Sequence, residues 1–196
     1  MPTADHDVSE ILRYVGACDE AIAWARPYGT DGKKAWAECD NPEWMLWLLG
    51  KLSGEPGSPK RRKLVGCCAE VAALVLPIFE QKYPGDNRVR DCIAVCRKHA
   101  DGKATLEEVA AASAAGAAAW AARAAGVAAW AAWAAGVAAW AAWASRDAWA
   151  ASGDAAWAAV AAVAAGAAMR KEICYLIRQQ YPTPPDVPEE TKEPAV

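Results

Sequence analysis

The chain has 196 residues, which is enough for one compact domain or two small ones. Its 21 basic and 24 acidic side chains give a formal net charge of −3, too balanced for generic electrostatic binding of DNA or of an anionic membrane. Hydrophobic residues make up 55% of the chain and 11 residues are tryptophan, a composition that excludes disorder of the whole chain.

The first half of the chain shows a succession of helix signals. Apolar residues at helical spacing predict an amphipathic helix over residues 8–25, which Arg26-Pro27 ends. A short helix over 33–39 follows, with Thr30 as its expected cap. Asp40 or Asn41 is expected to cap the next helix, with Pro42 at its favoured first position.

The middle of the chain predicts two longer helices. Ser58-Pro59 begins a helix that extends to about residue 82 and is bent at Pro77, which lacks a backbone N–H. Residues 87–100 form the next helix, which Asp101-Gly102 stops. Thr105 and Glu108 then form a capping box that opens a largely helical region up to residue 181. A break is expected within 145–154, and the tail after Pro182 is expected to be disordered.

An alanine-rich segment dominates the second half. Of the 59 residues between Ala110 and Ala168, 36 are alanine. A ten-residue repeat beginning at Gly116, Gly126 and Gly136 places tryptophan at regular positions. Ten residues fall about 80° short of three helical turns, so the aromatic stripe rotates around the helix and needs partners that wrap it. Aromatic stripes at helical spacing usually belong to a hydrophobic core. This favours a structural role for the tryptophans over a ligand site in which bases stack on indole faces.

One residue interrupts the repeat. Arg123 stands where the later repeats carry Trp133 and Trp143. Deep burial of that guanidinium would require an acidic partner or a bound anion.

The same region contains a stretch that is long enough to be considered as a membrane span. Residues 124–145 carry no charge, but they contain two valines and no leucine, isoleucine or phenylalanine. Membrane insertion depends on those large aliphatic and aromatic residues, so we expect no span, with a membrane-associated hairpin as the alternative.

A basic cluster, defined as Lys60, Arg61, Arg62 and Lys63, directly follows Ser58-Pro59. Four cations near a helix start oppose the macrodipole, which prefers acidic residues there. Together with free backbone amides, such side chains can bind a phosphate-bearing ligand or an acidic protein patch. A solvated cluster of no function is the competing interpretation.

The seven cysteines raise the question of a metal site. Cys92, Cys96 and His99 share a helix face and, with Cys67 or Cys68, could hold zinc. The same positions continue an apolar stripe, so the buried-core interpretation is favoured and no metal or cofactor is expected. Residues 1–10 lack the features of a secretory signal, which, with an odd cysteine count, predicts reduced thiols in a cytoplasmic protein.

No motif for catalysis is present. The sequence has two histidines, His6 and His99, and lacks a Ser-His-Asp set, a Walker loop and a glycine-rich dinucleotide turn. We therefore expect a protein that is not an enzyme.

Three segments together resemble a known family. They are Ala17-Cys18 through Ala35-Trp36-Ala37-Glu38-Cys39 to Trp44-Met45-Leu46-Trp47-Leu48, then Tyr83-Pro84-Gly85-Asp86-Asn87-Arg88-Val89-Arg90, and Gly102-Lys103-Ala104-Thr105-Leu106-Glu107-Glu108 before the alanine-rich run. This order is similar to that of the putative immunity-protein family, small helical proteins of bacterial toxin–immunity loci and phages. The resemblance spans roughly residues 10–180 and implies a binding protein with structural aromatic and cysteine positions and no catalytic residues. The expanded Trp-Ala repeat departs from the family, so the binding face is expected to differ.

These observations predict an all-α protein, a multi-helix bundle with a long Ala/Trp-rich hairpin. We expect an N-terminal helical subdomain over residues 1–103, the hairpin over 104–181 packed on it, and a disordered tail over 182–196. The leading functional hypothesis is an immunity or phage counter-defence factor that binds and blocks a host or toxin protein. The alternative is a sponge that sequesters an anionic nucleotide signal by tryptophan stacking and phosphate contacts. A homo-oligomer is possible in either case.

The candidate ligand- or partner-binding residues share a positive charge or an exposed aromatic face in these hypotheses. They are Lys60, Arg61, Arg62, Lys63, Arg88, Arg90, Trp120, Arg123, Trp130, Trp133 and Arg146.

Overall fold

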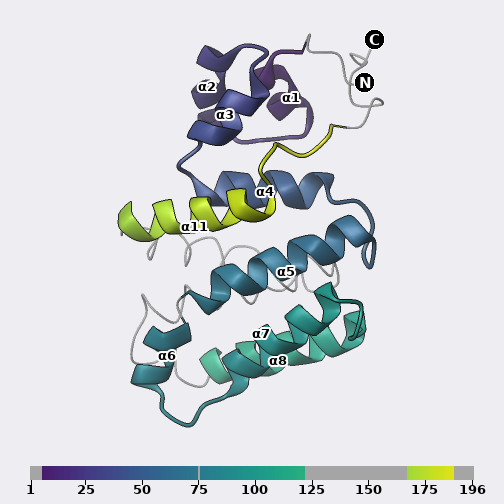
Figure 1. The fold of residues 1–196 in the computed structure, drawn as a ribbon, viewed down its shortest axis with the longest axis vertical. Helices are drawn as coiled ribbons and strands as arrows, with labels where there is room; N and C mark the ends of the chain where they lie inside the picture. The colour runs from purple at the N-terminus through teal and green to yellow at the C-terminus, as the bar shows by residue number, and fades with distance from the viewer. Residues whose placement is uncertain (1–5, 75, 122–166, 188–196) are drawn as a thin grey trace. The chain divides into compact units, whose positions relative to one another are not determined.

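The computed structural model describes residues 6–74, 76–121 and 167–187, shown in colour in Figure 1. Over these ranges the chain forms nine α-helices and one short 3-10 helix, with no strand. The predicted all-α fold class is confirmed. The chain divides into two compact units, a first unit of Met1–Ser53 with Lys171–Val196 and a second unit of Gly54–Arg170.

The first unit contains the beginning and the end of the chain. Its elements are α1 (Val8–Tyr14), α2 (Asp19–Ala25), the 3-10 helix η1 (Arg26–Tyr28), α3 (Gly32–Glu38), α4 (Pro42–Leu52) and most of α11 (Ala167–Gln180). Leu12, Ile22 and Ala25 form a buried cluster in this unit, with Trp24 and Leu48 packed against it. Burial of these apolar side chains is what joins the short helices.

The single helix predicted over residues 8–25 is wrong, because α1 and α2 are separate. Gly16 adopts φ +82°, a left-handed conformation that ends a helix. The Gly16 N–H donates to the Arg13 carbonyl at 3.1 Å and the Ala17 N–H to the Leu12 carbonyl at 2.9 Å. This pair of bonds is the Schellman motif. The apolar spacing continues across the break because α1 and α2 face the same core.

The caps of the next two helices follow the predictions in part. The Asp31 side chain, and not Thr30, caps α3 by accepting from the Lys34 N–H at 2.9 Å. The Asn41 side chain caps α4 by accepting from the Glu43 N–H at 3.0 Å, and Pro42 occupies the first helical position. The predicted start of α4 is therefore confirmed.

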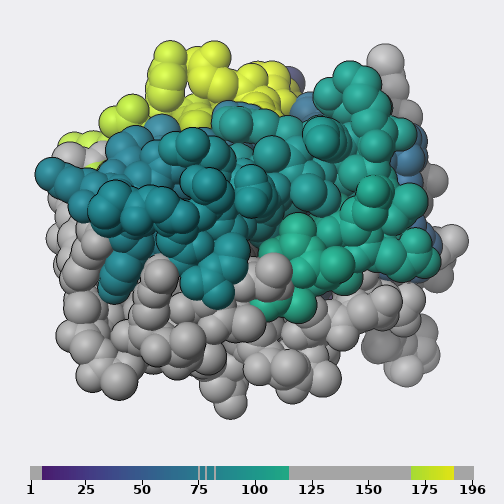
Figure 2. Space-filling model, turned by 90° about the horizontal axis from the view of Figure 1, so that it is seen from below, coloured from purple at the N-terminus to yellow at the C-terminus, as the bar shows by residue number. Residues whose placement is uncertain are grey.

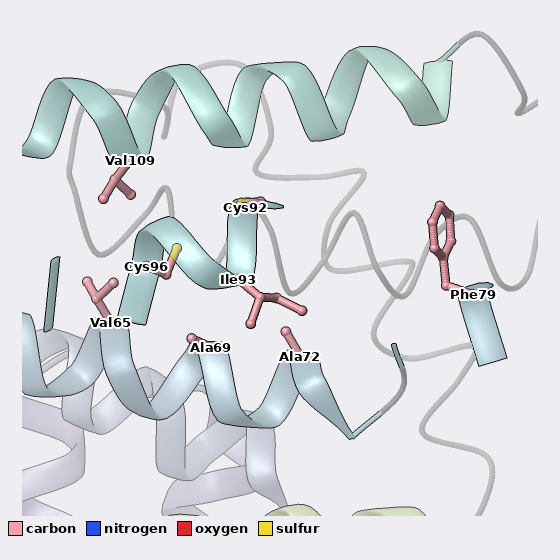
Figure 3. Close-up of a cluster of buried hydrophobic side chains, with 8 residues drawn as sticks. All are labelled: Val65, Ala69, Ala72, Phe79, Cys92, Ile93, Cys96 and Val109. Atoms are coloured by element: carbon pink, nitrogen blue, oxygen red, sulfur yellow. The ribbon is translucent and has the colours of Figure 1, made fainter. Parts of the chain in front are cut away.

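The second unit is built around α7. Its helices are α5 (Pro59–Ala73), α6 (Leu76–Lys82), α7 (Arg88–Ala100) and α8 (Leu106–Ala121). Helix α7 packs against both α5 and α8, and their atoms form adjoining surfaces in Figure 2. Figure 3 shows Cys92, Ile93 and Cys96 of α7 lying between α5 side chains and Val109 of α8.

A close backbone approach fixes the packing of α5 on α7. A Cβ atom built on Gly66 of α5 would lie 2.9 Å from the Cβ of Ala100 in α7. Only glycine fits at this crossing, because real Cβ atoms do not approach so closely. The Arg97 guanidinium of α7 also pairs with Glu70 of α5 at 2.7 Å. The two helices therefore run antiparallel.

The helix predicted over residues 58–82 is wrong as one element. Helix α5 ends at Ala73, and Pro77 lies at the second position of α6. A continuous helix would place the proline ring against the Ala73 carbonyl and leave that carbonyl without its donor. Pro77 therefore interrupts the helix instead of bending it, and the first turn of α6 accommodates it.

The predicted end of α7 and the predicted start of α8 are confirmed. Gly102 has φ +74°, and the bonds from Gly102 to His99 and from Lys103 to Lys98 close a second Schellman motif. The Thr105 N–H donates to the Glu108 carboxylate at 2.7 Å, and the Glu108 N–H donates to the Thr105 hydroxyl at 3.2 Å. This is the predicted capping box.

The helical region predicted up to residue 181 is described at its two ends, by α8 and α11. The predicted break within 145–154 and the uncharged segment 124–145 lie outside the described residues. No helix within the described ranges combines the length and apolar content needed to cross a bilayer.

Candidate functional site

The basic cluster lies at the start of α5, as predicted. The Ser58 hydroxyl caps this helix by accepting from the Arg61 N–H at 3.2 Å. Pro59 occupies the first helical position, so Lys60 falls in the first turn. The side chains of Lys60 and Lys63 are exposed, whereas Arg61 and Arg62 are half-buried.

The two arginines of the cluster hold the loop that precedes the helix. The Arg61 Nε and Nη2 donate to the Gly54 carbonyl at 3.2 and 2.8 Å. The Arg62 Nη1 donates to the Gly57 carbonyl at 2.7 Å. Burial lowers the pKa of Arg61, while the negative charge of Glu55 acts in the opposite direction. The guanidinium groups therefore fix residues 54–57 against α5 and keep their positive charge at its start.

The surroundings of the cluster carry both signs of charge. A Cβ built on Gly57 would lie 3.9 Å from the Leu106 side chain, so the loop adjoins the start of α8. The first turn of α8 contains Glu107 and Glu108. The cluster is thus a basic surface bordered by acidic residues.

Two further predicted arginines are engaged in ion pairs elsewhere in the second unit. Arg88 forms two hydrogen bonds with the Asp86 carboxylate, each of 2.9 Å, and this bonding raises the pKa of Arg88. The Arg90 Nη2 lies 2.6 Å from the Glu80 Oε1. Both arginines are at the beginning of α7, and α7 runs antiparallel to α5, so they are at the far end from the basic cluster. The structure does not bring the two groups together.

The tryptophan side chains of the predicted site lie outside the described residues. Trp120 belongs to the last turn of α8, but its side chain lies outside the described residues. Arg123, Trp130, Trp133 and Arg146 also lie outside them.

The residues considered for zinc lie in the core. Cys92 and Cys96 belong to the buried cluster of the second unit, as the favoured interpretation predicted. Within the described ranges, no group of three or more histidine, cysteine, aspartate or glutamate side chains is placed to hold a metal ion. A hydrogen bond with Cys96 lowers the pKa of Cys92 against the effect of burial, and Ser113 acts in the same direction.

His99 is a structural residue of the α7–α8 connection. Its ring is buried, with 3% exposed, and Nδ1 lies 2.8 Å from the Ala104 carbonyl. Since a carbonyl only accepts, Nδ1 carries the proton in this bond. The ring therefore holds the loop that leads into α8.

The Arg97–Glu70 pair was missed by the sequence analysis. The guanidinium forms two hydrogen bonds with the carboxylate, of 2.7 and 2.8 Å. The residues are separated by 27 positions and no local spacing connects them. The described surface thus offers charge recognition, through exposed ammonium groups and fixed guanidinium groups.

Comparison with known proteins shows which family the chain belongs to. Residues 56–181 match the family described as Imm-5 like putative immunity protein. No curated protein and no solved structure matches the chain. The matched region contains the basic cluster and two of the three resembling segments, and it begins after α4. Because the match covers more than half of its length, the chain belongs to the Imm-5 like putative immunity protein family.

Proposed function

We propose that this protein is a non-enzymatic immunity protein that binds a toxin protein and blocks it. Membership of the family supports an immunity-type binding role. We assign the toxin contact to the basic cluster, which lies inside the matched region and is exposed at Lys60 and Lys63. The chemistry of this surface suits an acidic patch on the toxin.

The observation that carries this assignment is the placement of Lys60 in the first turn of α5. A cation in the first turn opposes the helix macrodipole, so the stability of α5 does not explain why a lysine occupies this position. Arg61 and Arg62 bond to the loop carbonyls and thereby hold the surface in one conformation. A preorganised charged surface loses less entropy on binding, which favours affinity for a partner.

The partner in this proposal is a toxin. A phage counter-defence role would use the same surface on a host defence protein and differs only in the protein that is blocked. Localisation in the cytoplasm suits both roles and remains part of the proposal.

The nucleotide sponge is the competing function. It would combine the basic cluster with tryptophans of the repeat, which lie outside the described residues. Arg123, which with the basic cluster would hold the phosphates, also lies outside the described residues. The sponge is therefore kept as an alternative outcome of the test.

The test is co-expression with a candidate toxin that stops growth when it is expressed alone. The unaltered chain should restore growth, and the variant Lys60→Glu/Lys63→Glu should fail to do so because both contacts reverse their charge. The matched control is Lys33→Glu/Lys34→Glu, which reverses two exposed lysines of α3 and should still protect.

Two results would overturn the proposal. One is equal protection by both double variants, since the basic cluster would then have no part in binding. The other is stabilisation of the purified chain by cyclic nucleotides, with no effect of the toxin. A ligand at a hundred times its Kd raises the free energy of unfolding by about 2.7 kcal/mol, which a thermal melt detects.

A further inference from the structure

The first unit presents a second surface of different chemistry, an aromatic patch defined as Trp24, Tyr28 and Trp44. The ring centroids of Trp24 and Tyr28 are 4.9 Å apart, and those of Trp24 and Trp44 are 5.8 Å apart. Trp24 also packs against the Leu12 cluster of this unit, which holds the patch in place. All three aromatic side chains are only half-buried. Half-exposed tryptophan and tyrosine side chains on a fixed support are typical of protein interfaces.

Carboxylates surround this patch. Glu20 lies one helical turn before Trp24, so the two share a helix face. The Tyr28 hydroxyl is hydrogen-bonded to Glu38, and the negative charge of Asp40 also reaches it. These acidic side chains come from α2, from the end of α3 and from the connection to α4.

The charges near the patch favour a cation. Arg26 lies two residues after Trp24 and so points to the other side of the turn. Arg178 of α11 donates to the carbonyls of Trp36 and Cys39, so its charge is already used within the fold.

The same unit contains an example of the expected contact. The Lys51 ammonium lies over the ring of Trp47, 5.5 Å from its centroid. An indole face attracts a cation through its quadrupole, and a carboxylate at the rim adds a charged hydrogen bond. Arginine suits such a surface better than lysine, because its planar guanidinium stacks on a ring and pairs with a carboxylate at the same time.

We propose that the aromatic patch, with its rim of Glu20, Glu38 and Asp40, binds an arginine-bearing segment of a partner protein. This inference is independent of the proposed function, since it uses the other unit and the opposite charge. The whole patch also precedes residue 56, where the family match begins. In this proposal the patch is a binding surface separate from the region that matches the family.

The experiment titrates the full-length chain with a short arginine-rich peptide. The Nε1 resonance of Trp44, assigned by its loss in Trp44→Phe, should shift on binding. The variant Glu38→Gln/Asp40→Asn should weaken the peptide affinity about tenfold, which corresponds to about 1.4 kcal/mol. A lysine peptide of equal length should bind more weakly than the arginine peptide.

The matched control is Glu10→Gln/Glu172→Gln, which removes two exposed carboxylates of the same unit from α1 and α11. This control variant distinguishes binding at the aromatic patch from general attraction of the peptide to an acidic protein. The control variant should bind the peptide with the affinity of the unaltered chain. Equal weakening by both double variants would overturn the proposal, as would an unshifted Trp44 resonance at saturating peptide.

Discussion

The indole Nε1 of Trp36 donates a hydrogen bond of 2.8 Å to the backbone carbonyl of Tyr181, which follows it by 145 residues. Arg178 bonds in the reverse direction, with Nε donating to the Trp36 carbonyl at 3.1 Å and Nη2 to the Cys39 carbonyl. These carbonyls belong to the end of α3, where helical partners are missing and the dipole is negative. The two ends of the chain are thereby joined within the first unit.

Replacement of Trp36 by phenylalanine should destabilise the protein. Trp36 is 5% exposed, so the smaller phenyl ring leaves part of the indole volume unfilled, and the Tyr181 carbonyl loses the indole donor. The expected loss is about 1–3 kcal/mol in the free energy of unfolding, measured by urea denaturation. Trp47→Phe is the control, because this half-buried tryptophan should change stability by less than about 0.5 kcal/mol. Equal losses in both variants would show that the bond has no special role.

Replacement of Gly66 by alanine should also destabilise the protein, although alanine is the better helix former. The new Cβ would meet the Ala100 Cβ at 2.9 Å, and neither atom can move without a shift of α5 or α7. Overpacking of this kind costs about 1–3 kcal/mol. The second substitution Ala100→Gly should recover part of the loss, as a double-mutant cycle would measure. Simple additivity of the two changes would contradict the close approach.

Local signals predicted much of the fold. The Thr105–Glu108 capping box, the Asn41 cap and the Gly102 stop each depend on residues within one helical turn, and each is observed. The break at Gly16 was missed because the apolar spacing continued across it. Gly16 was the one residue in this stretch that could have indicated a helix end.

Contacts between distant residues could not be predicted. The position of the basic cluster at the start of α5 followed from Ser58 and Pro59. The bonds from Arg61 and Arg62 to the preceding loop depend on the path of that loop in space. For the same reason, the pairing of Arg97 with Glu70 and of Trp36 with Tyr181 has no pattern in the sequence.

The substitution Lys60→Glu should separate stability from binding. An acidic residue in the first turn of α5 complements the helix dipole, so the free energy of unfolding should rise by about 0.3–1 kcal/mol at low salt. The same change should weaken toxin binding, because it reverses a charge of the contact surface. Urea denaturation and a binding titration of one preparation provide both values. A variant that loses stability and affinity together would indicate a purely structural lysine.

The Glu70–Arg97 pair should make a small contribution that depends on pH. The hydrogen bond with Arg97 lowers the pKa of Glu70 below 4.5. The pair therefore stabilises the fold above the unfolded pKa, and this contribution disappears as the pH falls through the folded pKa. Because the Glu70 side chain is 40% exposed, solvent limits the effect to at most about 1 kcal/mol at pH 7. Glu70→Gln should lower stability at pH 7 and leave it unchanged at pH 2, whereas an equal loss at both pH values would contradict the pairing.

The most direct test of the central claim is a titration of the purified toxin with the purified chain. Toxin activity should fall in proportion to added chain and reach zero at a fixed stoichiometric ratio, with both proteins recovered intact from the complex. Inhibition that is complete at a small fraction of that ratio, or chemical change in the recovered toxin, would show turnover and contradict the account.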